Sequence, residues 1–246
     1  MAVAAIIPAK DEADRIAATV TAVRQLAEVD LVIVVDDGST DDTGEIARAA
    51  GAFVARHRRN RGKAAAMMTG AAHVARRDTT HPAADGDARA LLFVDADLEE
   101  SASALAALVP PVTTDRADMT IAVLPPQRRT GGGRGLVVGL AREGIADLTG
   151  WTSTQPLSGM RCLSRRAFEA ARPLARGWGV ETGLTIDVLD HGLRIEEVRC
   201  ALHHRVTGSD WRGQLHRGAQ YRDVWLALTT RRLARARRRL ASQRPG

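Results

Sequence analysis

The chain has 246 residues, of which 45% are hydrophobic and 3% aromatic, and its formal net charge is +6. This length supports one sizeable α/β domain with a core of aliphatic side chains. The two cysteines, Cys162 and Cys200, are too few to staple a domain. No apolar run approaches the ~18 residues of a membrane span, and no signal peptide precedes the first strand-like segment. We therefore expect a reduced, cytoplasmic protein that contacts at most the inner face of a membrane.

Strands and helices alternate through the first hundred residues. The predicted strands are Val3–Pro8, Leu31–Val35, Ala52–Ala55 and Leu91–Val94, and the predicted helices are Ala13–Ala27, a segment capped by Thr40 or Asp41 that runs to Ala50, and Gly62–Arg76. A continuous apolar run such as Leu31–Val35 is typical of a parallel strand that is covered on both faces. The alternation predicts an α/β fold with a mostly parallel central sheet flanked by helices. Ligands of such sheets bind beyond the carboxyl ends of the strands.

Beyond residue 100 the pattern changes to helices joined by short strands. The predicted helices are Leu136–Leu148, Ser164–Arg172 and Glu181–Leu189, and a strand is predicted at Arg194–Val198. We interpret residues 1–100 and 101–228 as two halves of a single domain. Residues 229–246 form an arginine-rich C-terminal tail, with seven arginines after residue 230, and we expect it to begin as a helix.

Two aspartates, Asp95 and Asp97, flank Ala96 directly after the fourth predicted strand. Two carboxylates that close repel each other unless a cation joins them. Hard oxygen ligands favour Mg²⁺ or Mn²⁺, which also bridges a diphosphate and neutralises charge on a departing one. The competing interpretation is a helix N-cap beside a solvated acid.

The second predicted strand ends at Asp36 and Asp37. A carboxylate there can accept hydrogen bonds from a base N–H or a ribose hydroxyl, and we assign Asp37 first to this role. Gly38 permits a tight turn, and the polar residues that follow can cap the next helix. Helix capping alone is the alternative function of this segment.

Two further turns lead from strands into helices. Pro8, Ala9 and Glu12 form the first, where a nucleobase can lie against the backbone, although Glu12 is equally suited to the positive end of a helix dipole. Gly62 and Lys63 form the other, which suits a diphosphate or a base edge. Lys63 is one of only two lysines in the chain, which argues against an ordinary surface lysine.

The second half offers fewer chemical groups. Gln155–Arg161 reads as a turn that feeds a short strand, and Glu181 follows two glycines at a predicted helix start. Glu181 can orient a sugar hydroxyl or merely cap the helix. His204 lies in a His-His-Arg segment after a strand, and it is a candidate third metal ligand because Asp97 alone leaves the ion under-coordinated.

The order of these motifs resembles the nucleotide-diphospho-sugar transferases of the GT-A fold, in the large family 2-like group. The matching elements are Pro-Ala-Lys-Asp-Glu, Asp-Asp-Gly-Ser-Thr-Asp-Asp-Thr, Gly-Lys and Asp-Ala-Asp, the DxD motif. The second half narrows the resemblance to the glucosyl-3-phosphoglycerate synthases, through Gly131–Arg134, Gln155–Gly159, Gly179–Leu184 with Ile186-Asp187, and His204-Arg205. The resemblance covers about Val3 to Leu228.

The resemblance implies a metal-dependent glycosyltransferase that moves a hexose, most simply glucose, from a UDP-sugar to a small acidic acceptor. By this resemblance residues 1–100 bind the nucleotide-sugar and residues 101–228 bind the acceptor. The donor-binding residues would be Pro8, Ala9, Glu12, Asp37, Lys63, Asp95, Ala96 and Asp97. Asp97 and His204 would hold Mg²⁺ or Mn²⁺, and Asp97 and Glu181 would be the catalytic residues. Gly133, Arg134, Ser158 and Gly159 would bind the acceptor.

Two departures concern the acceptor. Leu136 stands where the synthases carry a threonine, and Val206 stands where they carry an asparagine. Both changes remove polar groups that would hold phosphoglycerate, each hydrogen bond to a charged group being worth roughly 1–3 kcal/mol.

Three other functions are alternatives to this one. A polyprenyl-phosphate glycosyltransferase is the near alternative, since the arginine-rich tail suits anionic headgroups, although the tail has few large apolar residues for deep insertion. A sugar-nucleotide pyrophosphorylase should carry a glycine-rich loop near its N-terminus, and this chain has Pro-Ala-Lys-Asp-Glu there instead. Basic charge with few aromatics supports only non-specific nucleic-acid binding. A homodimer through a helix at Trp211–Leu228 is a further expectation.

Overall fold

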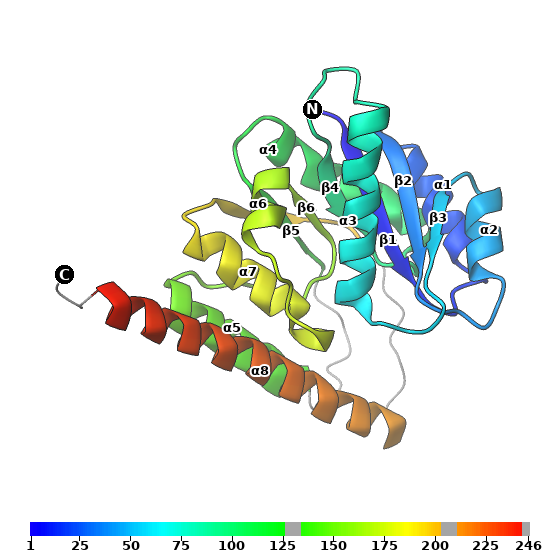
Figure 1. Ribbon diagram of the computed structural model, residues 1–246. Helices are drawn as coiled ribbons and strands as arrows, with labels where there is room; N and C mark the ends of the chain where they lie inside the picture. The colour runs from blue at the N-terminus through cyan, green and yellow to red at the C-terminus, as the bar shows by residue number, and fades with distance from the viewer. Residues whose placement is uncertain (126–133, 203–210, 243–246) are drawn as a thin grey trace.

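The computed structural model describes residues 1–125, 134–202 and 211–242, and a seven-stranded sheet forms the centre of this part of the chain (Figure 1). The strand order is β3-β2-β1-β4-β6-β5-β7. The strands are β1 (Val3–Ala9), β2 (Val29–Asp36), β3 (Phe53–Arg56), β4 (Ala90–Phe93), β5 (Met119–Val123), β6 (Arg161–Leu163) and β7 (Ile195–Arg199). Neighbours are parallel except where β6 pairs with β4 and β5. The predicted α/β fold with a mostly parallel sheet is confirmed.

Strand β1 fixes where the site forms, because it pairs with both β2 and β4. Ala9 lies opposite Asp36, and Ile6 lies opposite Phe93. The carboxyl ends of these three parallel strands therefore meet at one edge of the sheet. The loops that carry Glu12, Asp37 and the two aspartates after β4 all leave the sheet at this edge.

Strand β1 is apolar at almost every position because helices cover both of its faces. Val3, Ala5 and Ile7 pack with α1 (Ile16–Arg24), α2 (Thr43–Ala49) and the 3₁₀ helix η1 (Glu99–Leu108). Ala4 and Ile6 pack with α3 (Lys63–Thr80), α6 (Arg165–Ala170) and α7 (Val180–Asp190). This alternation of period two is what a strand between two helical layers requires.

A third layer lies against α7. Helices α5 (Arg134–Thr149) and α8 (Trp211–Ser242) run side by side beneath it (Figure 1). Their shared core consists of Val137, Ala141, Ile145, Ile186, Val224 and Leu228. Gly144 makes the close approach possible, because a Cβ there would lie 2.4 Å from Leu228 Cδ2. The remaining short elements are α4 (Val109–Thr113) and η2 (Gly177–Gly179).

Several elements differ from the sequence predictions. The first helix begins at Ile16 rather than Ala13, because the preceding residues bond to the loop after β2. Strand β5 was not predicted, although its apolar run Met-Thr-Ile-Ala-Val is a strand signal. It joins the sheet between β6 and β7, so the sheet continues across residue 100.

Helix α8 crosses the predicted start of the C-terminal tail at residue 229 without interruption. Arg231 and Arg235, both in that segment, pair with Asp187 and Asp190 on α7. The part of the tail that the structure describes is thus a helix packed on the domain, since these ion pairs and the core at Leu228 hold it there. Among the described helices, none has a stretch long and apolar enough to cross a bilayer.

Candidate active site

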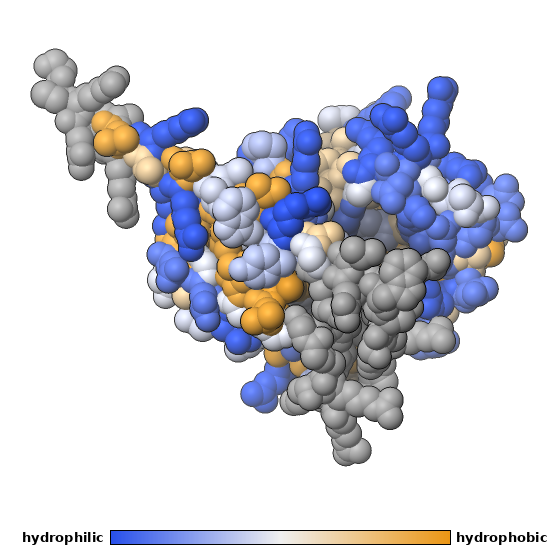
Figure 2. Space-filling view, turned by 90° about the horizontal axis from the view of Figure 1, so that it is seen from below, coloured by the Kyte–Doolittle hydropathy of each residue, from blue (hydrophilic) through white to orange (hydrophobic). Residues whose placement is uncertain are grey.

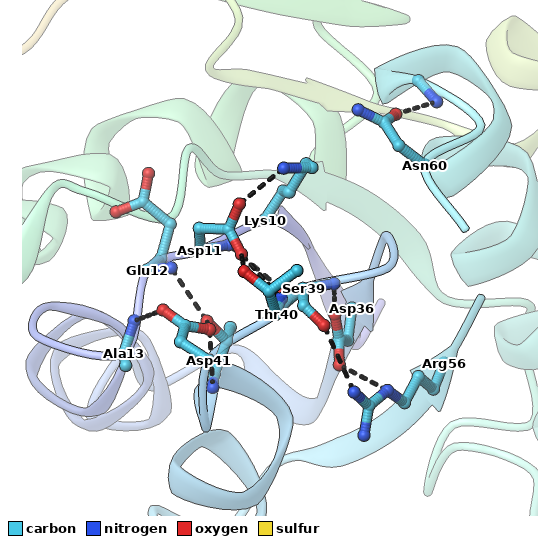
Figure 3. Close-up of polar contacts among 12 residues, drawn as sticks. Lys10, Asp11, Glu12, Ala13, Asp36, Ser39, Thr40, Asp41, Arg56 and Asn60 are labelled. Atoms are coloured by element: carbon cyan, nitrogen blue, oxygen red, sulfur yellow. Dashed lines mark hydrogen bonds and ion pairs between the residues drawn. The ribbon is translucent and has the colours of Figure 1, made fainter. Parts of the chain in front are cut away.

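The loops after β1 and β2 are tied to each other by side chains (Figure 3). Asp11 adopts a left-handed conformation, with φ of 55°. Its N–H donates to Ser39 Oγ at 3.0 Å, and its carboxylate accepts from the Thr40 N–H at 2.8 Å. Asp41 accepts from the Ala13 N–H at 3.1 Å. These contacts hold Pro8, Ala9 and Glu12 beside the loop that carries Asp37.

The structure changes the interpretation of Thr40 and Asp41. The N-cap of α2 is Asp42, and it makes no side-chain capping bond. Thr40 bonds across to the loop after β1, and Asp41 accepts both from the Ala13 N–H in that loop and from the Thr43 N–H at the start of α2. Asp41 therefore caps the first amide of α2, and both residues also join two strand ends, which the sequence could not show because the partners lie 28 and 29 residues away.

Asp36 and Asp37 serve different purposes. Asp36 is fully buried, accepts from the Ser39 N–H at 2.8 Å and pairs with Arg56 at 3.2 Å, so it shapes the loop. Asp37 Oδ1 accepts from the Arg61 N–H at 2.9 Å and meets His57 Nδ1 at 2.6 Å. Its other oxygen accepts from the Gly62 N–H at 2.7 Å. Asp37 therefore organises the turn that precedes Lys63.

His57 completes this arrangement, and the sequence analysis did not find it. It lies directly after β3, is buried, and its Nε2 meets Thr69 Oγ1 of α3 at 2.9 Å. The chain Asp37–His57–Thr69 links the end of β2 to α3. A polar residue at the end of a parallel strand was the available signal, since such positions face the ligand edge of the sheet.

We predict that His57→Phe raises the donor KM by roughly five- to tenfold and changes kcat little. The substitution removes hydrogen bonds that hold Asp37 and, through it, the amides at the start of α3, and each such bond is worth about 1 kcal/mol. Steady-state kinetics with varied nucleotide-sugar measures the effect. The exposed His81→Phe is the matched control. An unchanged donor KM in the His57 variant would remove this residue from the site.

Thr19 of α1 fixes the Asp95–Asp97 loop through two hydrogen bonds to its backbone. Thr19 Oγ donates to the Ala96 carbonyl at 2.9 Å and accepts from the Glu99 N–H at 2.8 Å. Glu99 has a φ of 52°, so the backbone turns sharply after Asp97. Thr19 is fully buried among apolar helix residues. Thr19 was not predicted from the sequence, although a threonine on an otherwise apolar helix face was the available signal.

Lys63 joins the two halves of the site. Its Nζ donates to Asp95 Oδ1 at 2.8 Å and lies 3.1 Å from Glu181 Oε1. Burial alone would lower the pKa of Lys63, but the carboxylates of Asp95 and Glu181 outweigh it and raise that pKa above its usual value. Three residues predicted from separate motifs are thus brought into one cluster, with Lys63 as a protonated cation between two acids.

Gly159 completes the wall of this cluster. A Cβ at this position would lie 2.3 Å from Lys63 Nζ and 2.9 Å from Asp95 Oδ1. Its neighbour Ser158 is buried, and the Ser158 hydroxyl has no hydrogen-bond partner among the described residues. Gly159 is therefore needed for close approach, and the neighbouring Ser158 hydroxyl is buried without a partner.

We predict that Gly159→Ala lowers kcat/KM roughly tenfold or more while the protein stays folded. The added methyl group pushes the Lys63 head away from Asp95, and displacements of about 1 Å near reacting groups have effects of this size. Activity assays with thermal unfolding of the same samples measure both quantities. Gly139→Ala, where no atom lies within 4 Å of the added group and φ is not positive, tests glycine loss without crowding. Full activity in Gly159→Ala would show that the contact is not needed.

Arg161 supports the turn that carries Ser158 and Gly159. It is buried at the start of β6 and donates to the carbonyls of Ser158 at 2.9 Å and Pro156 at 3.2 Å. A third bond goes to Thr185 Oγ1 of α7 at 2.9 Å. Burial lowers the pKa of Arg161 to about 10, although the charge of Glu181 opposes this shift. The sequence analysis treated Arg161 only as part of a turn and missed this supporting position.

Two acids lie close together beside the DxD motif. Burial and the charge of Asp97 both raise the pKa of Glu12, which the Arg15 ion pair at 2.5 Å opposes. Asp97 therefore adds its negative charge to that of Glu12 at this edge of the sheet. Within the described ranges, no three histidine, cysteine or acidic side chains cluster as a complete metal site. The other predicted ligand, His204, lies outside the described residues, as do Gly133 and the side chain of Arg134.

Comparison with known proteins decides the family. The sequence profile of Glycosyl transferase family 2 matches residues 4–170. The chain belongs to glycosyltransferase family 2. This family 2 chain is 32% identical over 212 residues to the glucosyl-3-phosphoglycerate synthase of Mycolicibacterium paratuberculosis, a match that spans 76% of the chain and 60% of that relative. An uncharacterized protein of Methanocaldococcus jannaschii is 28% identical over 202 residues, 78% of each chain.

Solved structures give the same answer for the fold. Glucosyl-3-phosphoglycerate synthase from Mycobacterium tuberculosis, in complex with Mn²⁺, UDP and glucosyl-3-phosphoglycerate, superposes with a TM-score of 0.74 at 29% identity, over 94% of this chain and 79% of that one. The same enzyme with Mn²⁺, UDP-glucose and phosphoglyceric acid gives 0.73 at 30% identity, over the same shares of each chain. The predicted GT-A fold and glycosyltransferase activity are confirmed.

Proposed function

We propose that this family 2 enzyme transfers glucose from UDP-glucose to a small acidic acceptor, with Mg²⁺ or Mn²⁺ as cofactor. The cluster of Lys63, Asp95 and Glu181 carries the proposal. It joins a nucleotide-binding turn, the DxD loop and the acceptor half within 3.1 Å of one ammonium group. The likeness to synthase structures that hold UDP with Mn²⁺ or Mg²⁺ supports the donor and the cofactor.

The donor would lie along the carboxyl ends of β1, β2 and β4. Pro8, Ala9 and Glu12 would line the uridine pocket, with Asp37 holding the turn at Gly62 so that the first turn of α3 and Lys63 face the diphosphate. A helix N-terminus favours such an anion. This role for Asp37 is more indirect than a bond to the base, because three donors already occupy its carboxylate.

Asp97 and His204 would hold the divalent ion, with Asp95 beside it. When bound, such an ion neutralises the charge that develops on a leaving diphosphate. Glu181 would accept a hydrogen bond from a sugar hydroxyl, and its contact with Lys63 keeps it oriented. Lys63 thereby couples the position of the sugar to the position of the DxD loop.

The acceptor would approach from the side of Ser158, Gly159 and Arg134. The Ser158 hydroxyl can donate to an acceptor oxygen, and Arg134 supplies a cation for an acidic group. Leu136, at 74% exposure on α5, offers no polar group to that acceptor. The acceptor is therefore described here as small and acidic, with 3-phosphoglycerate as the first compound to test.

Calorimetric titration with UDP, UDP-glucose and GDP-mannose, each with and without Mg²⁺ or Mn²⁺, tests the donor site. We expect metal-dependent binding of the uridine ligands and much weaker binding of GDP-mannose. Release of UDP from UDP-glucose is then measured with 3-phosphoglycerate and related acids. Failure of every uridine ligand to bind would overturn the donor assignment, whereas binding without transfer would redirect the search to other acceptors.

A polyprenyl phosphate is the second candidate acceptor. The observation that favours it is the row of exposed large apolar side chains on α8, at Tyr221, Trp225, Leu226, Leu233 and Leu240. A lipid-linked acceptor would require the enzyme to work at a bilayer. UDP release that depends on a short-chain polyprenyl phosphate, and not on phosphoglycerate, would favour this acceptor.

A further inference from the structure

Helix α8 has one face packed on the domain. Val224, Ala227 and Leu228 are buried against α5 and α7. One turn further along, the Arg231 guanidinium donates to Asp187 and the Arg235 guanidinium donates to Asp190. These contacts fix the rotation of the helix about its axis. They therefore determine which side chains of α8 point outward.

The outward face of α8 is rich in large apolar side chains. Tyr221, Trp225, Leu226, Leu233 and Leu240 are 45–66% exposed. At about 100° per residue, these five positions fall within an arc of roughly 140° that begins close to Leu228 and extends around the helix away from Val224 and Arg231. In the view from below, hydrophobic and hydrophilic side chains alternate along this side of the molecule (Figure 2). We call these five residues the α8 face.

Beyond Asp223 the charged residues are all of one sign, because no acidic residue follows it and seven arginines occur between residue 224 and the end of the chain. Arg222 and Arg232 have exposed side chains within the same arc as the α8 face, where they pair with Asp223 and Asp147, and the exposed Arg238 lies on the other side of the helix. A second copy of the helix would bring arginine against arginine. A partner with a continuous negative surface and an apolar interior would instead satisfy both properties.

We propose that the α8 face binds the surface of an anionic phospholipid bilayer. A helix face that mixes Trp, Tyr and Leu with arginines can lie in the interface plane, because the long arginine side chains reach the headgroups while the apolar groups are buried. The aromatic rings of Tyr221 and Trp225 sit at the depth of the headgroups, the three leucines reach the acyl boundary, and the arginines meet phosphates. The proposal goes beyond glycosyl transfer and does not depend on which acceptor is used.

Helix α8 contacts the segment that leads into the helix of Glu181. The Trp178 N–H donates to the Asp223 carboxylate at 3.2 Å, and Gly179 packs against the backbone of Asp223. Glu181 follows two residues later on α7. A bilayer on α8 would therefore border the helix that positions Glu181. The sequence analysis saw too few apolar residues for insertion because it considered the tail alone, without the residues at 221–226.

Vesicle co-sedimentation tests this proposal with the full chain. Vesicles of phosphatidylglycerol and phosphatidylcholine are compared with phosphatidylcholine alone, at low and at high salt. We expect binding to the anionic vesicles only, weakened by salt. Leu226→Ser with Leu233→Ser should reduce partitioning roughly tenfold or more, and Arg237→Glu about fivefold or more. Phe53→Ser, which removes an exposed apolar side chain from β3, should leave binding unchanged.

Two results would overturn the proposal. The first is equal binding by the Leu226/Leu233 double variant and the unmodified chain, or no binding to anionic vesicles at all. The second is a stable dimer in sedimentation velocity that the double variant converts to monomer, which would show that a second copy covers the α8 face. Circular dichroism of each variant confirms that the fold is retained, and calorimetry with UDP reports the donor site separately.

Discussion

Asp97→Asn should reduce glucosyl transfer at least roughly a hundredfold, the scale found when one charge-stabilising group is removed from an active site. Asparagine keeps the shape of the side chain but removes the negative charge that Asp97 contributes beside Glu12. The metal-dependent part of UDP binding should disappear with it. The measurements are UDP release in the presence of Mn²⁺, and calorimetric titration of UDP with and without the ion.

The size of this effect follows from how rigidly the DxD loop is held. Thr19 bonds to the Ala96 carbonyl and to the Glu99 amide, on either side of Asp97. The loop therefore has little freedom to bring another carboxylate into the same place. Glu100→Gln, an exposed acid three residues further on, is the matched control and should stay within about twofold of the unmodified enzyme. Full metal dependence in Asp97→Asn would mean that the ion, if required, is held by other residues.

Many residues of the proposed site could be predicted from the sequence, because their signals are local. A strand that ends in acids, followed by glycine and a helix, can be recognised without knowing its neighbours. Lys63, Asp95 and Glu181 were each found in this way. Their mutual contact was not predicted, because it depends on how β4, α3 and α7 pack, with Lys63 separated from Asp95 by 32 and from Glu181 by 118 residues in the chain.

The residues that were missed are those that support others. Thr19 and His57 touch backbone or buried side chains, so their function is visible only once the loops are in place. Strand β5 was missed for a related reason, since a five-residue apolar run does not by itself distinguish strand from helix. The predicted roles of His204 and Arg134 stay predictions, because the relevant atoms lie outside the described residues.

Lys63→Met should lower kcat/KM roughly a hundredfold and also destabilise the fold. The substitution leaves Asp95 and Glu181 facing each other without the ammonium that now lies 2.8 and 3.1 Å from them. Two carboxylates that face the same position without a cation repel each other, and we expect them to move apart. Loss of orientation at Glu181 and at the DxD loop would affect donor binding and turnover together.

The pH dependence of stability gives an independent check on Lys63. Its pKa is raised above the usual value of 10.5 by Asp95 and Glu181, against the lowering effect of burial. A group whose pKa is raised in the folded state contributes stability that is fully present below its unfolded pKa and is lost as pH rises through the folded one. The difference in unfolding free energy between the unmodified chain and Lys63→Met should therefore stay constant near neutral pH, and shrink only in strongly alkaline solution.

The only other lysine supplies the matched control for this experiment. Lys10 pairs with Asp11 at the surface, where an ion pair contributes little, so Lys10→Met should change kcat/KM by less than about threefold. Lys63→Arg should recover only part of the activity. It restores the positive charge, but the guanidinium is larger than the compact ammonium that fits beside Gly159. Equal activity of Lys63→Met and Lys10→Met would show that the cation between the two acids is a structural feature of the sheet edge and not part of the glycosyl-transfer site.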